Sequence, residues 1–156
     1  MRKVPFSAAP AVLTVLGLVL SCSKPQAVSG VRWQSDLQAA LDSAAAWNKP
    51  VLVEFMAEWC PSCRAMDEST FSHPHVTSKI YSFIPVRVDV DSQKTVADQY
   101  SATARKYGGI GIPNFLFLDP GGRPLVHRVG FLNARDFSAL MDSVLSLTPT
   151  VPASAR

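Results

Sequence analysis

The chain has 156 residues, of which 47% are hydrophobic and 17% charged, with 15 Lys and Arg against 12 Asp and Glu. This composition fits one globular domain with a sizeable core and excludes a disordered or collagen-like chain. Two of the basic residues are Arg2 and Lys3, and without them the count is 13 against 12, a net charge of +1. No basic patch of the kind that binds nucleic acid is left, so a nucleic-acid partner is not expected.

The N-terminus has the features of an export signal. An apolar run that starts at Ala11 is too short to cross a bilayer, which takes a helix of about 20 apolar residues. The run stops at Val19-Leu20-Ser21-Cys22, which resembles the bacterial lipoprotein signal, where the cysteine receives diacylglycerol. We therefore expect a signal peptide over residues 1–21 and lipidation of Cys22. The alternative is an ordinary cleaved signal followed by a free thiol.

Two polar segments flank the part of the chain that is expected to fold. Residues 22–30 contain Pro, Ser and Gly without apolar periodicity, which predicts a flexible tether behind the lipid anchor. Residues 149–156 are predicted to form a flexible tail, which leaves one domain over residues 31–148. The protein is then expected on the periplasmic side of the bacterial cell envelope, held to the lipid bilayer through Cys22.

Within the domain, helical and strand periodicities alternate, which is typical of an α/β fold. In chain order, we expect a helix over 35–47, a strand over 49–57, helices over 64–69 and 73–83, a strand over 84–91, a helix over 95–109, strands over 114–119 and 124–131, and a helix over 133–147. Ser35 or Asp36 is expected to cap the first helix and Asn133 the last, with Gly108 ending the fourth.

Cys60 and Cys63, separated by Pro61 and Ser62, follow the first predicted strand directly. Cys60 falls where a helix begins, so unpaired amide N–H groups and the positive end of the helix dipole favour its thiolate over its thiol. Cys63 lies one helical turn later, within reach of a mixed disulfide at Cys60 and in a more buried position. This spacing predicts a redox pair in which Cys60 is the nucleophile and Cys63 the resolving thiol.

Other interpretations of the two cysteines are weaker. Zinc would need more ligands, and His73 and His75 have an unusual spacing for a zinc site. A structural disulfide would close a loop so small that it constrains the unfolded chain little. We therefore expect no metal and no cofactor. A binding module or chaperone with incidental cysteines remains the alternative function.

Glu54 is an acid in the middle of an apolar strand, six residues before Cys60. A carboxylate in such a place is costly unless it is protonated or partnered, so a raised pKa is expected. Glu54 could then take the proton from Cys63, directly or through water. The alternative is that strand alternation turns the side chain to solvent.

The order of elements, the WCPSC sequence after the first strand and Ile112-Pro113 before the hairpin resemble the thioredoxin fold, an α/β fold with a central mixed sheet flanked by helices. Over roughly residues 48–145 the chain is more closely similar to the C-terminal thioredoxin-like domain of the thiol:disulfide interchange protein DsbD and its stand-alone lipoprotein relatives. The segments that carry this resemblance begin PVLVEFMAEWCPSC, GIGIPNFLFLDPGGRP and RVGFLNARDFSAL.

The resemblance implies roles for several residues. Pro113 would be in cis beside the cysteines, and Ile112 before it would pair with the backbone of a substrate. Trp59 would shield the site, with simple core packing as its alternative. Glu54 would match the buried acid of thioredoxins and Asp67 a second acid of the DsbD-type domain, although a solvated position on the helix is an equal alternative for Asp67.

The function expected from the sequence is a membrane-anchored, extracytoplasmic thiol:disulfide oxidoreductase. A reductase is favoured over an oxidase because the Pro61-Ser62 dipeptide lacks the His of strongly oxidising relatives. The expected partners are disulfides or thiols of exported proteins, the lipid bilayer through Cys22, and a membrane electron donor such as a DsbD-like protein.

Overall fold

The structure, a computed structural model, describes residues 30–106 and 111–148. Its elements are α1 (Leu37–Trp47), β1 (Val51–Met56), α2 (Pro61–Ala65), η1 (Met66–Thr70), α3 (Pro74–Ile80), β2 (Ile84–Asp89), α4 (Lys94–Lys106), β3 (Asn114–Leu118), β4 (Pro124–Val129) and α5 (Ala134–Leu147). This order is the one that the sequence predicts. No helix in the described ranges is long and apolar enough to cross a membrane.

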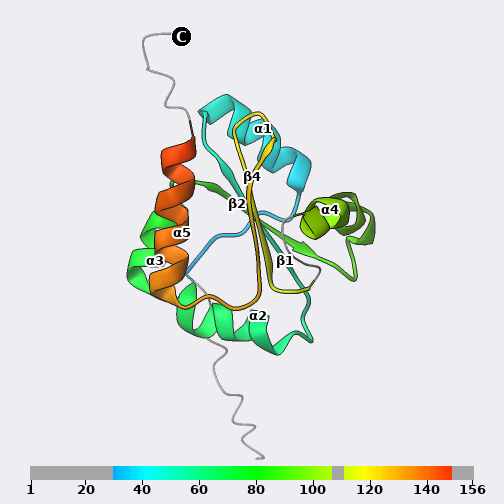
Figure 1. Cartoon of the computed structure of the whole chain (residues 1–156), viewed down its shortest axis with the longest axis vertical. Coiled ribbons are helices and arrows are strands. Elements are labelled where there is room, and N and C mark those ends of the chain that lie inside the picture. Colours follow the sequence, from blue (N-terminus) through cyan, green and yellow to red (C-terminus); the bar gives the residue numbers. More distant parts are fainter. Residues whose placement is uncertain (1–29, 107–110, 149–156) are drawn as a thin grey trace, which may run out of the picture.

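The four strands form one mixed sheet in the order β2-β1-β3-β4 (Figure 1). β1 runs parallel to β2 and antiparallel to β3, and β4 returns antiparallel to β3 as the predicted hairpin. Val51 lies opposite Ile84, and Met56 lies opposite Asp89 at the other end of the same pair. The cysteine segment leaves the sheet at this second end, because it follows Met56.

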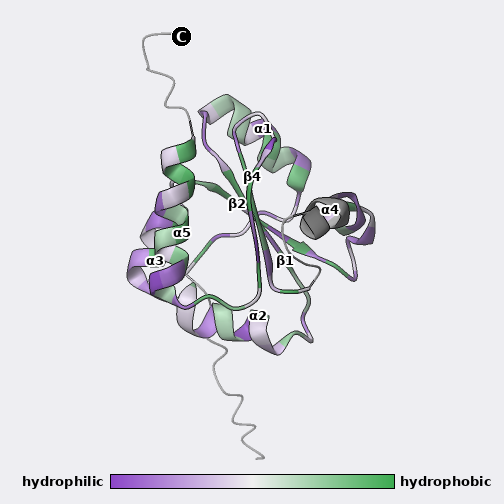
Figure 2. Cartoon of the chain, in the orientation of Figure 1, coloured by the Kyte–Doolittle hydropathy of each residue, from purple (hydrophilic) through white to green (hydrophobic). Residues whose placement is uncertain are grey.

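Helices cover both faces of the sheet, so the domain has three layers (Figure 1). One face packs against α1 and α4, and the other against α3 and α5. Figure 2 shows hydrophobic and hydrophilic residues on the same helices, as expected for helices with one buried face. On the α5 face, Phe71, Phe115 and Phe137 pack edge to face, with ring centroids 5.1–6.2 Å apart. Phe115 and Phe117 are both fully buried in the core.

Two of the predicted helix caps are confirmed. The Asp36 carboxylate accepts a hydrogen bond from the Ala39 amide at 3.1 Å, and the Asn133 side chain accepts one from the Asp136 amide at 3.0 Å. Each bond satisfies one of the amide groups that a helix start leaves unpaired. The predicted cap at Gly108 lies outside the described residues, as does Cys22.

The helix that carries the cysteines begins at Pro61, in agreement with the predicted helix start at Cys60. Its continuation over 64–69 differs from the prediction, because after Ala65 it becomes the π-helix η1, whose wider turn has the Phe71 amide donating to the Met66 carbonyl at 2.8 Å. Contacts with the loop after β4 hold this register. The Thr70 hydroxyl donates to the Leu132 carbonyl at 2.7 Å, and the Leu132 amide donates to the Met66 sulfur at 3.4 Å. The sequence pattern misses this because the partners lie more than 60 residues away.

Phe137 offers a test of the core. Phe137→Ala should lower the free energy of unfolding by about 3–5 kcal/mol, because it empties the centre of the aromatic cluster. Phe131→Ala is the matched control, since Phe131 is 48% exposed whereas Phe137 is fully buried, and it should cost no more than about 0.5 kcal/mol. Urea unfolding measures both values, and equal losses for the two variants would contradict this packing.

Candidate active site

Cys60 and Cys63 form a disulfide at the start of α2, with their Cα atoms 5.3 Å apart. Cys60 is the N-cap residue in extended conformation, and Pro61 occupies the first helical position, where its missing N–H costs nothing. The Cys63 amide donates to the Cys60 sulfur at 3.1 Å. A thiolate at Cys60 would therefore receive a backbone hydrogen bond together with the field of the helix start.

The exposure of the two sulfurs differs from the sequence-based expectation. Cys63 was expected to be the more buried cysteine, but both residues are only 1% exposed. They pack with Ala57 and are covered by Met56, Val90 and Ile112. In this disulfide state, it is position in the helix, and not exposure, that distinguishes Cys60 from Cys63.

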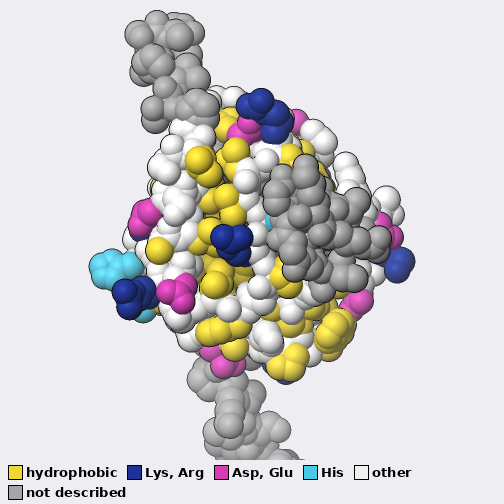
Figure 3. All heavy atoms as spheres, viewed as in Figure 1, with side chains coloured by type: hydrophobic (Ala, Val, Ile, Leu, Met, Phe, Trp, Pro, Cys, Tyr) yellow, Lys and Arg dark blue, Asp and Glu magenta, His cyan; other side chains and the backbone are white. Residues whose placement is uncertain are grey.

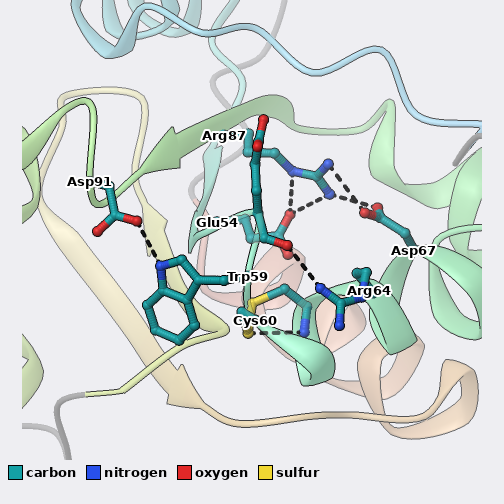
Figure 4. The surroundings of a disulfide bond; sticks show 9 residues. Glu54, Trp59, Cys60, Arg64, Asp67, Arg87 and Asp91 are labelled. Carbon is teal, nitrogen blue, oxygen red and sulfur yellow. Dashed lines mark hydrogen bonds and ion pairs between the residues drawn. A yellow bond between two sulfur atoms is a disulfide. The ribbon is translucent and has the colours of Figure 1, made fainter.

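Trp59 lies on the surface beside the cysteine pair. Its side chain is 62% exposed, which excludes simple core packing, and its indole N–H donates to the Asp91 carboxylate at 2.7 Å. Trp59 and Ile112 line a mainly apolar groove of about 250 Å³ next to the disulfide. Figure 4 shows Trp59 beside Cys60, with Asp91 holding the ring from the neighbouring loop.

The Ile112–Pro113 peptide bond is cis, as the resemblance implies. The Pro113 carbonyl accepts a hydrogen bond from the Gly130 amide at 2.8 Å, and Gly130 has a φ of +94° that favours glycine. The segment after β4 is thereby fixed against the Pro113 loop. Ile112 packs against the two cysteines, so the structure brings Trp59 and Ile112 together next to the disulfide.

Glu54 is fully buried in β1, so the alternative of a solvent-facing Glu54 is wrong. The register of the parallel strands places Arg87 of β2 opposite Glu54. Arg87 donates to Oε2 of Glu54 from Nε at 2.8 Å and from Nη2 at 2.7 Å. Oε1 of Glu54 is buried and has no hydrogen-bond partner among the described residues.

Asp67 completes the charged cluster, so it is not a solvated helix residue. Arg87 Nη2 donates to Asp67 Oδ1 at 2.7 Å, and Asp67 is held in η1 above the sheet. The guanidinium also lies over the Trp33 ring, 4.6 Å from its centroid, and 5.9 Å from that of Phe71. In Figure 4, Glu54 and Asp67 meet Arg87 from two sides.

The cluster contains two carboxyl groups and one cation, and this excess of acids affects the protonation of Glu54. Burial raises the pKa of Glu54 to about 7, the attraction of Arg87 opposes this rise, and the Asp67 charge adds to it. Burial lowers the pKa of Arg87, but Glu54 and Asp67 together outweigh it and hold the pKa above its ordinary value. Glu54 can therefore gain and lose a proton near neutral pH, as the sequence predicts.

Arg87 and Asp91 are site residues that the sequence analysis missed. Pairing of the strand over 49–57 with that over 84–91 would have indicated Arg87, since it lies opposite Glu54. Asp91 gives no local signal. His73 and His75 are exposed at the start of α3, and no group of three or more His, Cys, Asp or Glu within the described ranges could hold a metal ion.

The sequence over residues 32–120 matches the thioredoxin-like family. The match covers more than half of the chain. The chain belongs to the thioredoxin-like family.

Known relatives place it near the thiol:disulfide interchange proteins. It is 28% identical to TxlA of Synechococcus elongatus over its full length, covering 78% of that protein. It is 32% identical to DsbD of Yersinia enterocolitica over 65% of its length, but this covers only 17% of DsbD. The chain thus spans about a sixth of that relative.

Solved structures support the same fold. The chain resembles the oxidised C-terminal domain of Neisseria meningitidis DsbD with a TM-score of 0.56 and 26% identity, covering 72% of the chain and 98% of that domain. It resembles a Thermus thermophilus thioredoxin with a TM-score of 0.59 and 26% identity, covering 74% of the chain and 88% of the thioredoxin. The predicted thioredoxin fold is confirmed. Together with the Cys60–Cys63 disulfide, these similarities support thiol:disulfide oxidoreductase as the enzyme class.

The pKa of Glu54 predicts a pH dependence of stability. The folded protein holds the Glu54 proton up to a pKa of about 7, whereas the unfolded chain releases it near 4.5. The free energy of unfolding should therefore fall as pH rises from 5 to 8, by on the order of 2 kcal/mol. Glu54→Gln should remove this fall. The three histidines are present in both proteins, so their titration contributes to both profiles and does not account for a difference between them. Parallel urea-unfolding profiles of the two proteins over this pH range would contradict the prediction.

Proposed function

We propose that this protein is a lipid-anchored, extracytoplasmic thiol:disulfide oxidoreductase that reduces disulfides in exported proteins. The observation that carries the proposal is the Cys60–Cys63 disulfide at a helix start, packed against Ile112 of the cis Ile112–Pro113 bond. The strand before this helix start carries the buried acid Glu54. The similarity to thiol:disulfide interchange proteins supports the same chemistry.

The reaction begins with the reduced dithiol. The Cys60 thiolate attacks one sulfur of a substrate disulfide, so that a mixed disulfide forms and the other substrate sulfur leaves as a thiolate. The helix start and the Cys63 amide stabilise the attacking anion. Cys60 is the nucleophile in this scheme.

The second step resolves the mixed disulfide. Cys63 loses its proton and attacks the Cys60 sulfur, which releases the second substrate sulfur as a thiolate and leaves the Cys60–Cys63 disulfide. Two electrons pass from the enzyme to the substrate. Glu54 accepts the Cys63 proton, directly or through water. Its Oε1 is the accepting atom, because Arg87 occupies Oε2.

The apolar groove beside the disulfide receives the substrate chain. Trp59 and Ile112 form its walls at the cysteine pair. Pro113 fixes the backbone of Ile112 next to the sulfurs, so that a substrate segment can lie along it while its cysteine meets Cys60. Because Cys60 is only 1% exposed in the disulfide state, a thiol that re-reduces this disulfide must displace part of the cover to reach the sulfur.

Two further observations support the proposed direction of electron flow and the proposed electron donor. The Pro61-Ser62 pair supplies no cation to stabilise the reduced form strongly, which favours a reductase. A reductase outside the cytoplasm needs a source of electrons, and a DsbD-like membrane dithiol fits this need, in line with the similarity to DsbD.

Thiol-trapping variants test the two cysteine roles. Cys63→Ser should accumulate substrates as mixed disulfides on Cys60, because the resolving attack is lost, and Cys60→Ser should trap few. Non-reducing gels with mass spectrometry of the adducts measure this. Reduction of insulin by dithiothreitol should be accelerated by the unaltered protein and not by Cys60→Ser.

Two results would count against the proposal. Mixed disulfides that form mainly on Cys63 would reverse the roles assigned to the two cysteines, although the protein would still be an oxidoreductase. Insulin reduction that is no faster than with Cys60→Ser would instead favour a thioredoxin-like binding module or chaperone.

The lipid anchor is tested separately at Cys22. Cys22→Ala should block lipid attachment, so that the protein moves from the membrane fraction to the soluble fraction or remains as an unprocessed precursor. Fractionation with mass measurement of the mature N-terminus gives the answer. Release of lipid-free mature protein from the unaltered chain would support the ordinary cleaved signal.

A further inference from the structure

The exposed large hydrophobic side chains of the described residues gather at two opposite ends of the domain. They are Trp47, Trp59, Tyr81, Val129, Phe131 and Leu147. Three of them lie at the Cys60 end of the sheet: Trp59 follows β1, Val129 is the last residue of β4, and Phe131 follows β4. Figure 3 shows hydrophobic side chains at the lower edge of the molecule, near α2. Of these three side chains, Trp59 lines the groove beside the disulfide.

The other three lie at the far end of the sheet. Trp47 ends α1 just before β1 begins, Tyr81 follows α3 just before β2 begins, and Leu147 ends α5. Figure 1 shows the ends of α1 and α5 at the top of the domain, opposite α2. Nothing in the reaction at Cys60 uses this second group.

Hydrogen bonds tie Tyr81 of this group to Lys49 and to the start of the domain. The Lys49 ammonium donates to the Tyr81 carbonyl at 3.0 Å, and the Tyr81 hydroxyl donates to the Gly30 carbonyl at 3.2 Å. Trp47 is 61% exposed and lies two residues before Lys49. We call Trp47, Lys49 and Tyr81 the tether-side surface, because Gly30 is where the expected tether meets the domain.

The length of the tether limits how far this surface can lie from a membrane. Eight peptide units connect Cys22 to Gly30, and a fully extended chain of that length spans about 28 Å. If Cys22 carries lipid, the domain is held within this distance of the bilayer, with the Gly30 side nearest. Some part of the surface near Gly30 must then meet the lipid headgroups frequently.

The chemistry of the tether-side surface suits that encounter. Trp and Tyr are enriched at membrane interfaces because their rings are apolar and their N–H or O–H groups are polar. A lysine beside them is attracted to anionic headgroups. An exposed tryptophan with a neighbouring lysine and tyrosine is therefore better matched to a lipid surface than to water.

We propose that the tether-side surface rests on an anionic phospholipid bilayer, so that the end carrying Cys60 points away from the membrane. This rests on the lipid anchor proposed above. The bilayer would then orient the enzyme, leaving the groove at Trp59 and Ile112 open to exported substrates. The tether alone would leave the orientation of the domain unrestricted.

Two equally exposed tryptophans at opposite ends make the orientation measurable. The lipidated mature protein is reconstituted into phosphatidylglycerol-containing vesicles whose acyl chains are brominated near the headgroup, and quenching of tryptophan fluorescence is recorded. Trp47→Phe should lose most of the quenching, and the matched control Trp59→Phe should retain it. Quenching that is lost with Trp59→Phe, or absent from the unaltered protein, would overturn the proposal.

A second measurement separates this surface from the lipid anchor. Unlipidated Cys22→Ser protein should sediment weakly with anionic vesicles, and Lys49→Gln in the same background should reduce its apparent affinity roughly fivefold. This result does not need lipidation, so a failed anchor and a failed surface give different outcomes. Vesicle binding unchanged by Lys49→Gln and Trp47→Ala, or self-association through the same residues in sedimentation velocity, would contradict the proposal.

Discussion

The buried ion pair between Glu54 and Arg87 is the constraint that the site depends on. A carboxylate inside a sheet is costly unless a cation and hydrogen bonds compensate it. Arg87 provides both from the neighbouring strand, and it is itself held by Asp67 and by the rings of Trp33 and Phe71. The Arg87 guanidinium of β2 therefore contacts three other parts of the chain: Glu54 of β1, Asp67 of η1, and Trp33 in the segment before α1.

This arrangement keeps Glu54 between two extremes. A cation paired with Glu54 alone would favour a permanent anion, which is a poor proton acceptor at neutral pH. Burial without a cation would favour a permanently protonated acid. Arg87 shares its charge with Asp67, and burial acts against it, so the pKa of Glu54 settles near 7. The Glu54 side chain is long enough for its carboxylate to reach Arg87 of the neighbouring strand at 2.7–2.8 Å.

The sequence could predict what depends on neighbours along the chain. The Asp36 and Asn133 caps, the strand before the cysteines and the start of a helix at Cys60 are local features. The burial of Glu54 follows from the apolar strand around it. Other features depend on contacts between residues at least 20 positions apart in the sequence. These are the π-helix η1, the Trp59–Asp91 hydrogen bond and the contacts of Arg87. No periodicity within one element encodes such contacts, and only the register of β1 with β2 would have indicated Arg87.

The direction of the parallel strands explains why one domain can have two chemically different ends. β1 and β2 run the same way, so the segments that follow both strands meet at one end, where Cys60 and Asp91 lie. The segments that precede both strands meet at the other end, where Trp47 and Tyr81 lie. Thiol chemistry at the first end needs a shielded groove, whereas the second end, tied to Gly30, has no such requirement. If the domain is attached at the second end, as we propose, the first end stays unobstructed, and a large protein substrate can reach the cysteine pair there.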